Sequence, residues 1–469
     1  MPTATLLFTG CEDFLDKLPE NKVDKEKVDY TNTANMYMPV SGVYGILRQD
    51  GTHWMVHALH MQRDPDVWSG RTDDQAALLD FNKYQYDKSF WGLNEVFRVY
   101  YNVIMKANSA LEALDLYAAH ITSEADYNKY KNYTAEVRYI RSFAYFRLLD
   151  EFGQAPILLS NTQIDIPLKK KGSVERYILD ELAYCSSNLP AIRPNEQVHI
   201  GAVTKYSAQH LKAKVHLNRK EYQEVKLYTD SIINSGKFEL YTDYYNLFKI
   251  PGKVCNESLF EIQTTDFGNG SGEIITTNCW FVYQNCGNMG GWGFGAVNDE
   301  AIAFANARGE KVRAQTTFLT PGSTTKDGDA INMTSTHNSY LGKMYTPKNQ
   351  LTPGRTEAGM NNNVRIFRYA DVLLMNAEAK VRLGENGDAP LNLVRTRAEL
   401  DPVTNATVDQ ILDERRMEFM SEWGEYYSDI VRTERWNLLP STFKQSATYY
   451  PIPKGQIDLN PKFGQPAVD

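Results

Sequence analysis

The feature that most constrains the fold of this chain is a series of amphipathic helices that come in pairs joined by short turns. Apolar residues recur at helical spacing from Tyr206 to Asn218 and again from 222 to 232, with only a short turn between. This spacing places the apolar side chains on one face of each helix, so the two helices can pack as a hairpin. A second pair is predicted at 100–114 and 135–152, and Gly153 ends it because glycine accepts the left-handed backbone of a helix cap.

Two further helical segments lie towards the carboxyl end of the chain. The pattern predicts a helix from Val364 to Leu383 that is capped by Gly384. Thr407 with Gln410 is a capping-box pattern, and the helix that follows is expected to reach about Glu422. A helix pair of about 34 residues with small alanines at the contact is the plan of tetratricopeptide repeats. We therefore predict a mainly α fold of tetratricopeptide-like helical repeats, with a non-repetitive helical bundle as the alternative.

Between these helical groups the composition changes. Of the 30 glycines, half lie between Gly252 and Gly359, and aromatic residues are interspersed with them. A segment of this length in a compact protein is either disordered or functional, and its aromatic residues argue against disorder. We predict a large loop-rich insertion that forms a ligand-binding face, with a short strand at 258–264.

The net charge and the hydropathy pattern limit which classes of partner this chain can have. The chain has 469 residues and a net charge of -8, so it carries no overall positive field that would attract nucleic acid. No apolar run reaches the roughly 18 residues that a membrane-spanning helix needs. The first eleven residues resemble the end of a bacterial lipoprotein signal, which makes Cys11 the predicted lipid anchor. The alternative is an ordinary N-terminus with a stray cysteine.

The remaining cysteines are Cys185, Cys255, Cys279 and Cys286, which are too few for a disulfide framework. The last two are separated by six residues, which does not fit a zinc knuckle, so a disulfide or two free buried thiols are expected there. The sequence around Asp327-Gly-Asp329 lacks the rest of a calcium loop, and ordinary turn use is favoured. We predict no cofactor, and the sequence leaves open whether a structural calcium ion binds.

We find no sequence motif of the strongly constrained catalytic or nucleotide-binding classes, such as a phosphate-binding glycine loop, a zinc helix or a nucleophile elbow. Acidic residues do gather around Trp68, at Asp64, Asp66, Asp73 and Asp74. Two such carboxyl groups on either side of a sugar could act as acid and base in a glycosidase. They could equally form a polar rim, and we expect a protein that is not an enzyme.

The tryptophans indicate where a ligand would bind. Trp54, Trp91, Trp423 and Trp436 lie in or beside helical patterns and are expected in the core. Three others lie among polar residues and glycine, where we expect exposed rings that stack on a sugar, with anchoring of loops as the alternative. The predicted glycan-binding residues are Trp68, Asp66, Arg71, Asn278, Trp280, Tyr283, Asn285 and Trp292.

Four segments together resemble the SusD/RagB family. They are Glu12-Asp-Phe-Leu-Asp16 after the cysteine, the helix from Ala135 to Gly153, the segment from Val364 to Ala379, and Tyr450-Pro-Ile-Pro453 with Asn460-Pro461. The resemblance implies a surface-exposed, lipid-anchored outer-membrane protein of Bacteroidota, built on tetratricopeptide-like helices. It also implies that the protein captures oligosaccharides and acts as a lid on a SusC-like TonB-dependent transporter.

The resemblance also implies how the chain is divided. Residues 1–11 would be the remnant of a lipoprotein signal, and residues 12–469 a single SusD-like domain. Helical pairs are expected at about 90–245 and 364–436, and the ligand face at about 246–363 together with the 50–90 segment. Three alternatives stay open: a peptide-binding member of the family like RagB, a glycoside hydrolase, and a tetratricopeptide scaffold without a small ligand.

Overall fold

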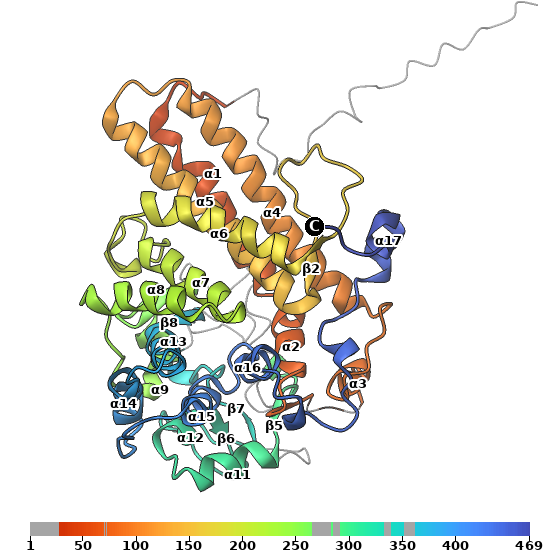
Figure 1. Ribbon diagram of the computed structural model, residues 1–469, viewed down its shortest axis with the longest axis vertical. Helices are drawn as coiled ribbons and strands as arrows, with labels where there is room; N and C mark the ends of the chain where they lie inside the picture. The colour runs from red at the N-terminus through yellow and green to blue at the C-terminus, as the bar shows by residue number, and fades with distance from the viewer. Residues whose placement is uncertain are drawn as a thin grey trace, which may run out of the picture.

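The computed structural model describes residues 28–69, 71, 73–264, 283–284, 291–332, 339–350 and 362–469. Long helices form one end of the molecule, while shorter helices and most of the small strands form the other (Figure 1). This architecture confirms the predicted class, a mainly α fold with tetratricopeptide-like helical pairs.

The longest pair consists of α4 (Trp91–Ala118) and α5 (Glu124–Phe152), which pack along each other. The α1 helix (Tyr37–Gly51) packs on both of them, and α6 (Lys171–Asn188) packs on α5. The α5 helix ends at Gly153, whose φ of 65° lies in the left-handed region that favours glycine. The helix end predicted from the sequence is therefore confirmed, whereas the helix begins earlier than the 135–152 pattern indicates.

The predicted hairpin after residue 204 is also present, as α7 (Lys205–Asn218) and α8 (Tyr222–Asn234). Thr204 caps α7, since its hydroxyl accepts the backbone N–H of Ser207 at 3.4 Å. The α8 helix packs against α13 (Tyr369–Arg382), although the two are far apart in sequence. The amino-terminal and carboxyl-terminal helical pairs thus form one continuous array (Figure 1).

Two more helices complete this array, α14 (Asp388–Arg397) and α15 (Val408–Phe419), and both pack on α13. The capping box predicted at the start of α15 is confirmed. Gln410 donates its backbone N–H to the Thr407 hydroxyl at 3.3 Å, and its side-chain oxygen accepts the N–H of Thr407 at 2.9 Å. The helix ends three residues before the predicted Glu422.

The prediction of a helix beginning at Val364 is wrong, because Val364–Arg368 forms strand β8. It pairs antiparallel with β4 (Ser258–Ile262), the strand that the sequence predicted, and Ile262 lies opposite Val364. All residues of both strands are buried. Valine, isoleucine and phenylalanine pack well on a pleated strand, and β4 supplies hydrogen-bond partners for the backbone. The helical spacing is realised only from Tyr369 onwards.

A small four-stranded antiparallel sheet connects the 50–90 segment to the loop-rich segment. Its order is β1 (Val67–Trp68), β5 (Ala296–Val297), β7 (Tyr340–Leu341) and β6 (Phe318–Leu319). Trp68 lies opposite Ala296, so the two parts of the predicted ligand face are joined by backbone pairing. Further elements are α2 (Trp54–Gln62), α3 (Ala77–Phe81), β2 (Gln154–Ala155), β3 (Lys169–Lys170), α9 (Tyr244–Leu247), α11 (Asp299–Ala307), α12 (Val312–Thr317), α16 (Glu425–Thr433) and α17 (Lys454–Leu459).

A buried network of ion pairs connects β8 to the end of α15. The guanidinium of Arg368 lies 3.0 Å from Glu257, 2.5 Å from Glu418 and 2.6 Å from Glu422, and all four side chains are buried. The surrounding cations, Arg397 and Arg368 foremost, hold the pKa of the Glu418 carboxyl well below its usual range against the opposing effect of burial. Paired in this way, the charges hold the strand and the helix at a fixed distance.

The described residues test only part of the predictions about the cysteines. Cys185 is buried and Cys255 is partly buried, and both are free thiols. Cys11, Cys279 and Cys286 lie outside the described residues, so the predicted lipid anchor and the predicted disulfide or thiol pair stay predictions.

Candidate functional site

Three tryptophans from three separate segments meet at one place on the surface, and we call them the tryptophan patch: Trp54, Trp91 and Trp292. Trp91 is the first residue of α4 and Trp54 the first of α2, while Trp292 lies in the 291–295 segment. The ring centroids of Trp91 and Trp292 lie 5.6 and 5.7 Å from that of Trp54, at interplanar angles of 65° and 89°. Trp91 is 44% exposed and Trp292 41%, whereas Trp54 is only 9% exposed.

Two further aromatic rings support this patch from inside the protein. Tyr283 is stacked against Trp54 with centroids 5.4 Å apart, and Phe294 is stacked against Tyr283 at 5.2 Å. Both are buried, and the Tyr283 hydroxyl accepts a hydrogen bond from Gln62 at 2.8 Å. The exposed indoles therefore rest on a rigid, close-packed aromatic base.

Hydrogen bonds hold the Trp91 indole and the backbone of Trp292. The indole N–H of Trp91 donates to the side-chain oxygen of Gln75 at 3.2 Å. The Arg71 guanidinium donates to the backbone carbonyl of Trp292 at 2.9 Å and lies over the ring of Phe294. Arg71 is itself held by two hydrogen bonds to Asp73, of 2.9 and 2.7 Å. The orientation of the patch is thus set before any ligand arrives.

The polar border of the patch carries fixed charges. The hydrogen bond from Arg71 holds the pKa of the Asp73 carboxyl below its usual value, and the same bond raises the pKa of Arg71. Both groups are therefore charged at neutral pH. Flat apolar rings beside guanidinium, carboxylate and amide groups suit a ligand that has an apolar face bordered by hydroxyl groups.

The structure brings together three of the predicted site residues, Arg71, Tyr283 and Trp292, although Tyr283 supports the patch from below and is not accessible. Trp68 is half-buried in β1. Asp66 is buried, and its carboxylate is bound by Arg416 through contacts of 2.9 and 2.5 Å. Because that carboxylate is paired inside the protein, Asp66 is not among the groups that we propose contact a ligand. Asn278, Trp280 and Asn285 lie outside the described residues.

The prediction that Trp91 lies in the core is wrong, because its side chain is exposed. The burial predicted for Trp54 and Trp423 is confirmed, and Trp436 is half-buried. Trp91 opens α4, and the apolar stripe that packs on the other helices begins at Leu93. The polar run Asp87-Lys88-Ser89 precedes Trp91 in the sequence. It indicates that the chain is still at the surface where α4 begins, so it could have predicted the exposure of Trp91.

The acidic residues considered as a catalytic pair do not face solvent together. Asp64 is buried next to Asp66, and burial raises the pKa of its carboxyl to about 8. Its side chain accepts the backbone N–H of Asp66 at 3.0 Å, a local turn contact. Asp73 and Asp74 are exposed, and the first of them is tied to Arg71.

The described residues contain no group of three metal-ligating side chains. Asp329, from the calcium-like sequence, accepts hydrogen bonds from the Tyr345 hydroxyl and from the N–H of Lys348, which fits its predicted use in a turn. Among the helices of the described segments, none is both long and apolar enough to cross a bilayer.

Two protein-family models and several known proteins are similar to this chain. A family model described as "SusD family" matches residues 256–438, and one described as "Starch-binding associating with outer membrane" matches residues 13–184. A SusD-like protein of Bacteroides ovatus is 26% identical over 92% of this chain and 81% of its own length. The starch-binding protein SusD of Bacteroides thetaiotaomicron is 25% identical over 71% of this chain and 72% of its own length.

Solved structures show the same fold. A structure named for its complex with a xylogluco-oligosaccharide superposes with a TM-score of 0.78 at 22% identity, over 92% of this chain and 99% of that one. The surface glycan-binding protein A of Bacteroides thetaiotaomicron, in complex with laminarihexaose, gives a TM-score of 0.73 at 21% identity, over 91% and 97% of the two chains.

Proposed function

Because the chain belongs to the SusD/RagB family, we propose that it is a surface glycan-binding protein that captures oligosaccharides on the tryptophan patch. The observation that carries this proposal is the exposure of Trp91 and Trp292, which both pack against the buried indole of Trp54. Large aromatic side chains usually contribute their area to a core. Two exposed indoles packed against the same buried indole are better explained by a ligand.

A sugar ring would bind the patch through its C–H face. By analogy with the stacking of nucleic-acid bases on aromatic side chains, each indole would contribute about 1–3 kcal/mol. Gln75, Arg71 and Asp74 lie at the border, where they can hydrogen-bond sugar hydroxyls and so set the orientation. Binding of this kind releases its ligand unchanged, and we propose that the protein is not an enzyme.

The named ligands of related structures suggest the class of sugar to test first. One of the similar structures is described as laminarin-binding, another contains laminarihexaose and a third a xylogluco-oligosaccharide. All three ligands contain neutral glucose chains. We propose neutral glucan oligosaccharides as the first candidates for this chain.

We further propose that the protein passes its ligand to a SusC-like TonB-dependent transporter in the outer membrane, held there by a lipid on Cys11. The family model that matches residues 13–184 is described as associating with the outer membrane. The helical array presents an extended packed surface of the kind that repeat proteins use for partners, and we propose it as the face towards the transporter.

A glycan array followed by calorimetry tests this function directly. We expect saturable binding of at least one neutral oligosaccharide with a micromolar to millimolar dissociation constant, and no release of reducing sugar during prolonged incubation. A parallel array of peptides examines the RagB-like alternative. Binding of peptides alone would contradict the glycan proposal, and turnover of an oligosaccharide would contradict the non-catalytic role.

A further inference from the structure

His53 packs against two of the three indoles of the tryptophan patch. It lies in the short turn between α1 and α2, and its side chain is half-buried. The imidazole is stacked on the Trp54 ring with centroids 6.0 Å apart and planes at 27°. It meets the Trp91 ring edge to face, with centroids 6.4 Å apart and planes at 89°. The imidazole is therefore part of the aromatic packing that holds the patch together.

The same imidazole caps α2. His53 is the residue before the helix, and its Nδ1 accepts the backbone N–H of Met55 at 3.3 Å. The first N–H groups of a helix have no partner within the helix, so an acceptor at this position stabilises the first turn. Trp54 is the first residue of that turn. The cap therefore holds the backbone of the buried indole on which Trp91 and Trp292 pack.

The cap requires one protonation state of His53. A ring nitrogen accepts a hydrogen bond only when it carries no proton, so the neutral imidazole has its proton on Nε2. A second proton would go to Nδ1 and turn the acceptor into a donor. It would also place a positive charge at the N-terminus of α2, where the helix dipole disfavours it. The capped arrangement thus exists only while the imidazole is neutral.

Three charged side chains act on this imidazole, Asp50 from α1 and Glu95 and Arg98 from α4. Arg98 makes hydrogen bonds of 3.0 and 2.5 Å to Glu95 and lies 3.9 Å from Asp50, so the two carboxylates share one cation. Burial has the largest effect and lowers the pKa of His53 from its usual 6.5. The folded protein therefore binds this proton less readily than the unfolded chain, and acidification below about pH 6.5 works against the capped arrangement.

We propose that His53 is a positioning residue of the tryptophan patch, and that it holds the indoles in their binding arrangement only while its imidazole is neutral. Affinity for a ligand is then highest at neutral pH. It falls in acid, because protonation releases the first turn of α2 and with it Trp54. This inference rests on the proposed function, since it concerns the same patch, and it adds a residue and a pH dependence to it.

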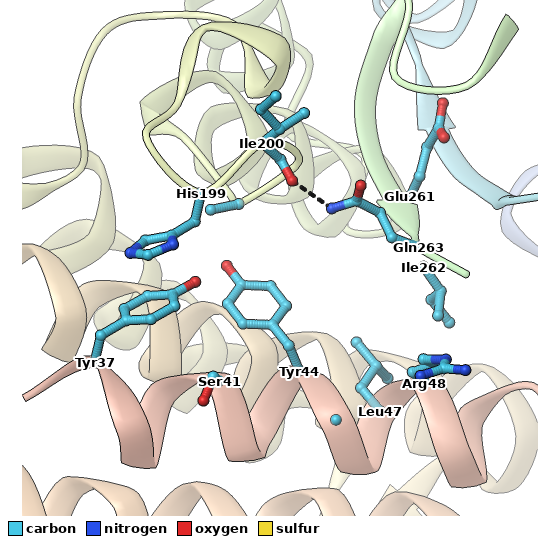
Figure 2. A pocket seen from close by; sticks show the side chains of 12 residues that line it. Tyr37, Ser41, Tyr44, Leu47, Arg48, His199, Ile200, Glu261, Ile262 and Gln263 are labelled. Carbon is cyan, nitrogen blue, oxygen red and sulfur yellow. Dashed lines mark hydrogen bonds between the residues drawn. The ribbon is translucent and has the colours of Figure 1, made fainter. Parts of the chain in front are cut away.

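His53→Asn separates the cap from the titrating ring. Asparagine is among the best capping residues, and its side-chain oxygen can accept the Met55 N–H at any pH. The matched control is His199→Asn. The His199 imidazole is also stacked on an aromatic ring, that of Tyr37, with centroids 3.4 Å apart, and burial also lowers its pKa. It lines a separate pocket beside α1 that shares no residue with the patch (Figure 2).

The first measurement needs no ligand. Nuclear magnetic resonance of labelled protein follows the imidazole of His53 and the indole N–H signals of Trp54 and Trp91 between about pH 7.5 and 4.5. Trp54→Phe and Trp91→Phe assign the two indole signals. We expect both to shift with the midpoint of His53, and their heteronuclear Overhauser effects to fall in acid because the indoles become more mobile. The signals should stay constant in His53→Asn and follow the wild type in His199→Asn.

The second measurement is calorimetry with the best-bound oligosaccharide over the same pH range. The dissociation constant of the wild type and of His199→Asn should rise at least about threefold in acid, and that of His53→Asn less than about 1.5-fold. All three proteins carry the same carboxylates, so the difference belongs to His53.

The inference is overturned if the indole signals of the wild type do not follow the titration of His53. It is also overturned if His53→Asn keeps the pH dependence of affinity seen in the wild type. Absence of sugar binding at every pH would instead contradict the proposed function, and the ligand-free measurement would still decide whether His53 positions the indoles.

Discussion

The guanidinium of Arg71 donates a hydrogen bond to the backbone carbonyl of Trp292 across 2.9 Å, although the two residues are 221 positions apart in the sequence. This contact ties the 291–295 segment to the 50–90 segment beside β1. Asp73 binds the same guanidinium, so together the two residues hold the backbone of Trp292 in place. The precision of the patch therefore depends on a residue whose main role is to position another.

We expect Arg71→Lys to weaken oligosaccharide binding about three- to tenfold. Lysine keeps the charge but cannot make the forked pair of bonds to Asp73 while reaching Trp292, and each such bond is worth about 0.5–1.5 kcal/mol. Calorimetry measures the affinity, and the melting temperature should change little because the pair is at the surface. Arg98→Lys, at an exposed pair with Glu95 on α4, is the control. Unchanged affinity in Arg71→Lys would show that Trp292 is positioned by other contacts.

Arg368 gives a prediction about stability. Replacing it with methionine leaves Glu257, Glu418 and Glu422 buried without their shared cation, which should lower the free energy of unfolding by about 3–5 kcal/mol. Denaturant titration measures this loss. Lys83→Met removes the exposed partner of Asp80 and should cost less than about 1 kcal/mol. Equal effects of the two substitutions would contradict the structural importance of the buried charges.

Glu136 gives a prediction about pH. Burial raises the pKa of its carboxyl from 4.5 to about 8, so the folded protein keeps a proton that the unfolded chain has lost. This residue therefore stabilises the fold below about pH 4.5, and that contribution is lost as the pH rises to about 8. We expect Glu136→Gln to make the free energy of unfolding less dependent on pH between 5 and 8, by up to about 1.4 kcal/mol per pH unit. Parallel curves for variant and wild type would contradict the raised pKa.

Two helix-ending glycines allow a comparison. Gly153 and Gly384 have φ angles of 65° and 77°, but a Cβ on Gly153 would lie 2.5 Å from the ring of Tyr449, whereas one on Gly384 would have no neighbour within 4 Å. Alanine at either site carries the left-handed strain of about 1 kcal/mol, and only Gly153→Ala adds a steric clash. We expect the larger drop in melting temperature for Gly153→Ala. A smaller drop for Gly153→Ala would mean that Tyr449 moves away at little cost.

The helical pairs could be predicted from the sequence because their information is local. Gly153 and the Thr407–Gln410 capping box each act within a few residues, and the structure confirms them. The segment from Val364 could not be assigned this way. Its strand depends on β4, about a hundred residues earlier, and a short apolar run fits a strand or a helix equally well.

The site was only partly predictable for a related reason. The polar surroundings of Trp292 correctly indicate an exposed ring, whereas Trp91 belongs to the helical pattern of α4, which wrongly predicts that it is buried. Whether a residue at the first turn of a helix is covered depends on what packs over that end. The sequence around Asp66 indicates a polar surface residue. In the structure its carboxylate is buried and accepts a hydrogen bond from Arg416, which is 350 positions away in the sequence.

The most direct test of the account is calorimetry of the best-bound oligosaccharide with the Trp91→Ala/Trp292→Ala double variant. Loss of two stacked rings should weaken binding at least about thirtyfold while the fold persists. Trp436→Ala, which removes a half-buried indole stacked on Phe443, should bind within about twofold of the wild type. Binding by the double variant at wild-type affinity would contradict the assignment of the tryptophan patch as the glycan-binding site.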